Sequence, residues 1–296
     1  MSLAEGPPDL PYPRLPFWDT VGLSYSTYFQ HFLDAVRASW LWLIVAAAAT
    51  SVASWMQWSW MATAMSQLKP GVLPQISRPM EATVLWNLDN AVLLLAGVSI
   101  AVAWHRLMIL DERPGFSGGN IATKTLWRYV GIAVAIFLIN FLPAAAVMVP
   151  MSYFLSPVKA GVQPPLALFA LVPLILVLFA VGGAAAIRLS LLLPARAIGN
   201  RELTIKQTWR RTHGNIWRLL WGVALTTFPP MIIAQIGFVM LIGFPNPASF
   251  ASGYFVRDMS VASTVFSVYY LLIVPIGIGF LSHAYRHFFQ APLELP

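Results

Sequence analysis

The chain has 296 residues, of which 58% are hydrophobic and only 10% are charged, and its net charge is +7. Soluble domains carry about 25% charged residues, so too few polar groups are present to cover a globule of this size, and lipid must form part of the solvent. The chain has no cysteine, which excludes disulfides, thiolate metal sites and a cysteine nucleophile.

The first segment, MSLAEGPPDLPYPRLP, lacks the apolar run of a cleavable signal peptide. We predict a disordered cytoplasmic tail over 1–19, a single membrane domain over 20–290 and a C-terminal tail over 291–296. Within TVGLSYSTYFQHFLDAVR, at the start of that domain, apolar residues at helical spacing predict an amphipathic interfacial helix. Its expected apolar face consists of Val21, Tyr25, Tyr28, Phe29, Phe32, Leu33 and Val36.

Six segments further along are long and apolar enough to span about 30 Å of hydrocarbon at about 1.5 Å per residue. Spanning segments must be helical, because lipid offers no hydrogen-bond partners to the backbone. We therefore predict an all-α polytopic membrane protein with six transmembrane helices. The expected spans lie near 40–62, 85–107, 129–153, 166–188, 217–242 and 262–284.

A similar pattern follows the second and fourth spans: GNIATKTLWR at 119–128 and GNRELTIKQTWR at 199–210. We interpret it as a repeat of three units, each a short interfacial amphipathic helix followed by a helical hairpin. The alternative is that these stretches share only the chemistry of a membrane boundary.

Lys and Arg residues gather in the N-terminal tail, the second and fourth loops and the C-terminal tail. The other loops hold only Lys69, Arg78, Lys159 and Arg257. This bias predicts that both termini and the two basic loops are cytoplasmic. The arginine- and alanine-rich composition favours a bacterial cytoplasmic (inner) membrane.

His105 and Arg106 stand side by side where the second expected span reaches the cytoplasm. We interpret the pair as a boundary marker, with Arg106 extending to the headgroups; the alternative is a functional role.

The fourth loop contains an expected interfacial helix. Thr204 and Gln207 have capping-box spacing, and Gly214 is placed to end the helix. Cations there would face anionic headgroups, although positive-inside bias alone is the simpler reading. Neither reading needs a nucleic acid. The predicted contacts to anionic lipid are Arg106, Arg188, Lys206, Arg210 and Arg211.

No motif of a serine hydrolase, zinc protease or nucleotide-binding loop is present. His283 and His287 share a helical face but lack an evident third ligand. We therefore predict no catalytic, cofactor or metal site.

Three polar residues fall within the expected spans. Asp89 is expected in the first turn of the second span on the outer side, where the helix dipole favours a carboxylate. Asn140 and Gln235 lie deeper and are expected to bond to neighbouring helices; the alternative is a polar path through the bundle. The Pro229-Pro230 pair predicts a kink or an interruption in the fifth span.

RLSLLLPARAIG (188–199) and TWRRTHGNIWRLLWG (208–222) resemble a family of uncharacterised bacterial six-span inner-membrane proteins. These are similar to the membrane domain attached to some glycerophosphoryl diester phosphodiesterases. The matching residues are Arg188, Leu191, Pro194, Gly214, Asn215, Trp217 and Arg218. The resemblance implies a fold and a location but not hydrolysis, because no soluble stretch is long enough to form a phosphodiesterase domain.

The sequence thus favours a non-enzymatic membrane-organising or accessory protein that contacts lipid, a partner membrane protein or a second copy of itself. The main alternative is a transporter or channel for a small solute, and an intramembrane enzyme is a third hypothesis.

Overall fold

The computed structural model describes residues 14–67, 78–115, 123–154, 167–242 and 253–290, and every regular element in these ranges is helical, which confirms the all-α class. In chain order the helices are α1 (Phe17–Gln30), α2 (Phe32–Ser66), α3 (Met80–Leu110), α4 (Lys124–Phe154), α5 (Ala167–Leu189), α6 (Leu192–Ala197), α7 (Ile205–Arg211), α8 (Ile216–Ile242), α9 (Gly253–Tyr285) and the π-helical turn η3 (Arg286–Gln290).

Five helical segments of the described chain are long and apolar enough to cross a bilayer: Phe32–Ser66, Met80–Leu110, Val177–Ala197, Ile216–Met240 and Tyr254–Gln290. By helix length and hydropathy, the chain is a multi-pass membrane protein. The remaining expected span, 129–153, falls within the 31 residues of α4. Several α4 side chains lie outside the described residues, so a count of six spans stays a prediction.

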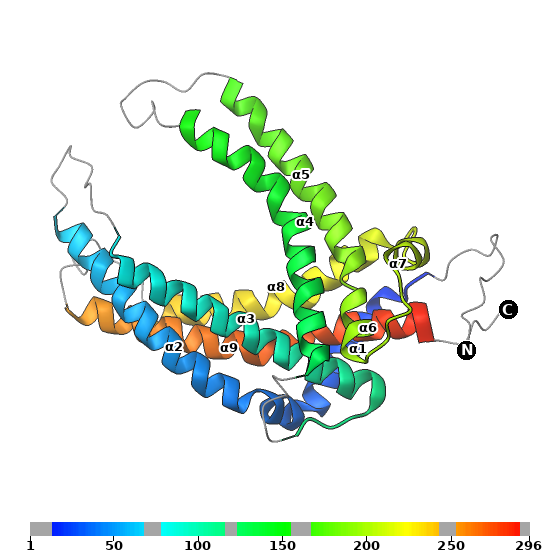
Figure 1. Ribbon diagram of the computed structural model, residues 1–296. Coiled ribbons are helices and arrows are strands. Elements are labelled where there is room, and N and C mark those ends of the chain that lie inside the picture. The colour runs from blue at the N-terminus through cyan, green and yellow to red at the C-terminus, as the bar shows by residue number, and fades with distance from the viewer. Residues whose placement is uncertain (1–13, 68–77, 116–122, 155–166, 243–252, 291–296) are drawn as a thin grey trace.

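The long helices form two groups that diverge from a common base (Figure 1). Helices α2, α3, α8 and α9 form a bundle in which α9 contacts the other three, and α4 and α5 pair as a hairpin. This hairpin leaves the bundle at an angle, and the short helices α1, α6 and α7 gather at the base (Figure 1). The consecutive pairs α2–α3, α4–α5 and α8–α9 each pack side by side, as helical hairpins do.

The base contains a well-packed core. Leu191, Leu219 and Phe280 are completely buried there, and Tyr285 is 1% exposed. Close packing of α8 on α9 depends on Gly222, because a Cβ atom at this position would lie 1.9 Å from Cζ of Phe280. The phenyl ring therefore occupies the space that a side chain on α8 would take.

The predicted N-terminal tail is wrong for residues 14–19. Leu15 is completely buried, its N–H donates to Oδ1 of Asn215 at 2.9 Å, and its carbonyl accepts from Arg218 at 2.9 Å. Helix α1 then begins at Phe17. Residues 1–13 and 291–296 lie outside the described residues.

The predicted amphipathic face of the first helix is only partly right. Helix α1 buries Thr20, Val21, Ser24 and Tyr28 and packs against α8 and α9. Phe29 and Leu33, both on the expected apolar face, are 69% and 78% exposed and do not share the buried side of α1. The difference arises because α1 ends at Gln30 and α2 begins at Phe32, so the expected face is divided between two helices.

Candidate functional site

The arginines concentrate at the base, which we call the basic end. Several of them bridge elements that are distant in sequence, by donating to backbone carbonyls. Arg211 donates to Phe288 at 2.9 Å, Arg218 to Leu15 at 2.9 Å and Arg286 to Met108 at 3.5 Å. A guanidinium carries five donors in a fixed fork, so one bond to a carbonyl leaves others for a further ligand.

Helix α7 projects from the basic end with its predicted cap in place. The Gln207 N–H donates to Oγ1 of Thr204 at 3.2 Å, and the Thr204 N–H donates to Oε1 of Gln207 at 2.9 Å. This reciprocal capping box confirms the expected helix start. Gly214 has φ of +76°, the left-handed conformation that separates α7 from α8.

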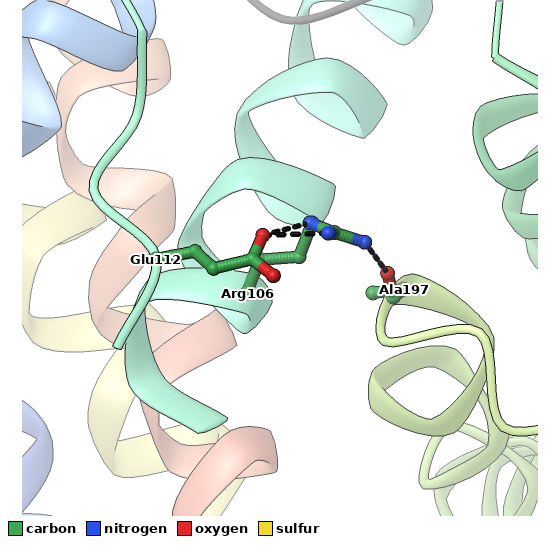
Figure 2. Close-up of polar contacts among 3 residues, drawn as sticks. All are labelled: Arg106, Glu112 and Ala197. Atoms are coloured by element: carbon green, nitrogen blue, oxygen red, sulfur yellow. Dashed lines mark hydrogen bonds and ion pairs between the residues drawn. The ribbon is translucent and has the colours of Figure 1, made fainter. Parts of the chain in front are cut away.

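Arg106 joins α3 to α6 (Figure 2). Its Nε and Nη2 donate to Oε2 of Glu112 at 2.8 and 2.5 Å, and its Nη1 donates to the Ala197 carbonyl at 3.2 Å. Asp111, with φ of +56°, turns the chain sharply after α3 and brings Glu112 back toward Arg106. The two side chains are 35% and 49% exposed, so this ion pair contributes at most about 1 kcal/mol.

His105, the neighbour of Arg106, is completely buried. Its Nδ1 lies 2.8 Å from Oγ of Ser282 in α9, and its Nε2 lies 3.3 Å from the hydroxyl of Tyr129 in α4. Ser282 donates to the Ile278 carbonyl at 2.9 Å. One tautomer satisfies every group: Nδ1–H donates to Ser282, and Tyr129 donates to Nε2.

The boundary interpretation is therefore wrong for His105, which links α3, α4 and α9 inside the protein. Ser282 is also completely buried, so its contact with His105 gives a substrate no access to a serine–histidine pair. The signal for burial was present in the sequence, since Val98, Ala101, His105 and Met108 share one helical stripe and all are buried.

Asp89 is the tenth residue of α3, because the helix begins at Met80 rather than near residue 85. The prediction that it lies in the first turn is wrong. The side chain is 6% exposed, and Oδ1 accepts a hydrogen bond of 2.8 Å from Thr50 in α2. Asp89 thus ties α3 to α2 through a satisfied buried carboxyl group.

Of the other two intramembrane polar candidates, only Gln235 has a described side chain, and the structure does not bring it to Asp89. Gln235 is exposed on α8, whereas Asp89 faces α2. The side chain of Asn140 lies outside the described residues.

The candidate cations differ in their surroundings. Arg188 stacks on the Trp209 ring at 4.4 Å from the ring centroid, and Arg106 and Arg211 are bonded to the protein. Lys206 and Arg210 are exposed on α7. His283 lies near Thr27, at 3.3 Å, and the described residues contain no cluster of three potential metal-ligating side chains.

A cavity of about 470 Å³ opens beside Arg106, between the end of α3, the turn at 112–115 and the start of α4. Arg106, Glu112 and Arg113 line it together with Thr123 and Thr125, and Val102, Ala103, Leu126 and Ser99 also contribute. Sequence reasoning did not find this site, because the residues that line it come from segments separated by up to 27 positions.

Comparison with known proteins leaves the family open. No protein-family model matches the chain, and neither a curated protein nor a solved structure matches it. The chain is a multi-pass helical membrane protein. The resemblance to six-span inner-membrane proteins stays a prediction.

Proposed function

We propose that this is a non-enzymatic membrane-organising or accessory protein of a bacterial cytoplasmic membrane. Its basic end faces the cytoplasm and holds anionic lipid headgroups, and a partner membrane protein or a second copy of the chain can use the same end. The proposal follows the positive-inside rule, because the arginine-rich segments form this end.

The outer surface of α7 is the observation that carries the proposal. Thr208 and Thr212 are completely buried, whereas Ile205 and Trp209, one turn apart, are 60% and 44% exposed. Lys206 and Arg210 are exposed on the same helix. A short helix that presents apolar, aromatic and cationic side chains is suited to the headgroup region, where the apolar groups insert and the cations meet phosphates.

Exposed tryptophans at the basic end support this placement. Trp18, Trp217 and Trp221 are 73%, 68% and 57% exposed and line a shallow groove with Arg218. Indole rings are enriched at membrane–water interfaces, where the ring meets the hydrocarbon and the N–H meets water. The groove thus supports the proposal that the lipid headgroups lie at the level of α1 and the start of α8.

Transport of a small solute is the alternative, and it has less support. It invokes a polar path near Asn140, Gln235 and the Pro229-Pro230 pair, but Gln235 is exposed on α8, and α8 is continuous through both prolines.

The double variant Lys206→Gln/Arg210→Gln tests the proposal. Each cation near an anionic surface contributes about 1 kcal/mol to lipid binding. The affinity of the double variant for phosphatidylglycerol supplied in vesicles is therefore expected to fall roughly thirtyfold. The matched control is Arg78→Gln/Arg257→Gln, which removes two charges at the other end of the helices. Lipid retained through purification is measured for both proteins, and equal retention would refute the proposal.

A further inference from the structure

We infer that the cavity beside Arg106 binds one anionic glycerophospholipid, with the phosphate at its basic mouth and the acyl chains on its apolar wall. This inference rests on the proposed function and assigns it a specific site. The cavity has a volume of about 470 Å³, which is large enough for a headgroup, its glycerol and the first part of the chains.

The mouth of the cavity is positively charged. Arg106 and Arg113 line it, and Glu112 supplies the one carboxylate among the lining residues that the structure describes. Arg106 uses three N–H donors on Glu112 and Ala197, so two of its five donors are left for a phosphate. Arg113 is exposed and makes no ion pair within the described residues. The Thr123 and Thr125 side chains add hydroxyl groups.

The wall below the mouth is apolar. Val102 and Ala103 of α3 and Leu126 of α4 line it, and Leu126 is almost fully buried. Helices α3 and α4 diverge away from the base (Figure 1), so acyl chains can leave the cavity along the surface of α3. A soluble phosphorylated compound would gain nothing from this wall.

Ser99 gives an independent sign of a ligand. It lines the cavity and is 3% exposed, yet its Oγ has no hydrogen-bond partner among the described residues. Other buried serines of this protein, such as Ser39 and Ser260, donate to the carbonyl four residues earlier. A buried hydroxyl without a partner destabilises the fold, and a ligand acceptor removes that cost.

The depth of Ser99 fits a lipid ester. Ser99 precedes Arg106 by seven residues, which is roughly 10 Å along the helix axis. A phospholipid places its ester carbonyls below its phosphate by a distance of the same order. Arg113 and Arg106 therefore hold the phosphate while Ser99 donates to an ester carbonyl.

Native mass spectrometry of the delipidated full chain in detergent tests the assignment. The probes are phosphatidylglycerol, phosphatidylcholine with the same acyl chains, and glycerol 3-phosphate, which has the phosphate without the chains. We expect one tight phosphatidylglycerol per chain and at least fivefold weaker binding of the other two. Binding of glycerol 3-phosphate as tight as that of the lipid would overturn the lipid assignment in favour of a small-phosphate site.

Variants locate the bound lipid. Arg113→Gln is expected to weaken binding about fivefold, since one cation contributes about 1 kcal/mol, and Ser99→Leu is expected to remove the tight lipid by filling the cavity. Val102→Phe fills the same space and serves if Ser99→Leu does not fold. Arg257→Gln is the charge-matched control. Unchanged lipid binding in both filled-cavity variants would overturn the inference.

The two proposals fail separately. Lys206→Gln/Arg210→Gln is expected to leave the tight lipid in place, because these residues do not line the cavity. If that variant loses total retained lipid while the filled-cavity variants retain the tight lipid, the cavity assignment is wrong and the proposed function stands.

Discussion

The hydroxyl of Tyr25 in α1 donates a hydrogen bond of 2.7 Å to the carbonyl oxygen of Leu225 in α8. Leu225 precedes Pro229 by four residues, and proline has no N–H to complete that turn of the helix. A side chain of another helix thus satisfies the carbonyl that proline leaves free. The Pro229-Pro230 pair does not interrupt the helix, since α8 runs unbroken from Ile216 to Ile242; a kink at the pair stays a prediction.

Replacing Tyr25 with Phe removes this donor and leaves a carbonyl without a partner. We expect the free energy of unfolding in detergent to fall by about 1–3 kcal/mol. Tyr28→Phe is the control, because Tyr28 donates to Leu272 at 3.0 Å, and the residue four positions further, Ile276, has an N–H to offer that carbonyl. Equal losses in the two variants, measured by denaturant titration, would show that the proline is irrelevant.

The same bond predicts how stability depends on pH. Burial is the main cause that raises the pKa of Tyr25 above its ordinary value, and only the protonated hydroxyl can donate to Leu225. A raised folded-state pKa means that the stabilisation is fully present below the unfolded pKa of about 10 and is lost as pH rises through the folded value. The stability difference between the native chain and Tyr25→Phe should therefore be constant from about pH 6 to 9. A stability difference that changes within this pH window would contradict the assignment of this hydrogen bond to the protonated Tyr25 hydroxyl.

Gly222 and Gly237 offer a matched pair on α8. A methyl group at Gly222 would lie 1.9 Å from Cζ of Phe280, whereas nothing lies within 4 Å of one at Gly237. Gly222→Ala should lower the melting temperature, with a cost of about 1–3 kcal/mol for forced repacking. Gly237→Ala should leave it unchanged or raise it, because alanine favours the helix. A loss of similar size in both variants would mean that contact with Phe280 is not the cause of the loss at Gly222.

The presence of the five candidate spans was predictable because the thickness of the bilayer sets a minimum length for an apolar helix that crosses it. The expected 217–242 differs from α8 by one residue at its start. The start of α7 was predictable too, since its capping box is a local pattern. The start of α9 was not: it begins at Gly253, nine residues before the apolar run, and polar residues in this first part, such as Ser260, donate to carbonyls of the turn before them.

The features that the sequence did not predict depend on contacts between segments that are far apart in the chain. Hydropathy places Leu15 in a polar, proline-rich tail, but Asn215, 200 positions later, accepts its N–H. Asp89 and His105 were expected at positions that water reaches. Instead, Thr50 bonds to Asp89, and Ser282 and Tyr129 bond to His105, where water would otherwise supply the hydrogen bonds. No periodicity within one segment encodes such partners. The cavity beside Arg106 is concealed for the same reason.

The His105 contacts predict coupled losses of stability. Tyr129→Phe removes the donor to Nε2, and Ser282→Ala removes the acceptor of Nδ1–H, so each is expected to cost about 1–3 kcal/mol. Because both act through His105, the double variant should cost measurably less or more than the sum of the single variants. Tyr270→Phe, the same chemical change at a 39% exposed residue, should be close to neutral. Strict additivity in the double-mutant cycle would mean that His105 does not couple the two groups.

The orientation in the membrane can be read from single cysteines, since the native chain contains none. Met80, at the start of α3, is 78% exposed, and Glu202, beside α7 at the basic end, is exposed as well. Positive-inside bias predicts that a membrane-impermeant thiol reagent labels Met80→Cys in intact cells and labels Glu202→Cys only after the membrane is opened. The native chain serves as the unlabelled control. Labelling of both positions from one side would remove the cytoplasmic assignment of the basic end, and with it the expectation that α7 and the cavity beside Arg106 meet the anionic lipids of the inner leaflet.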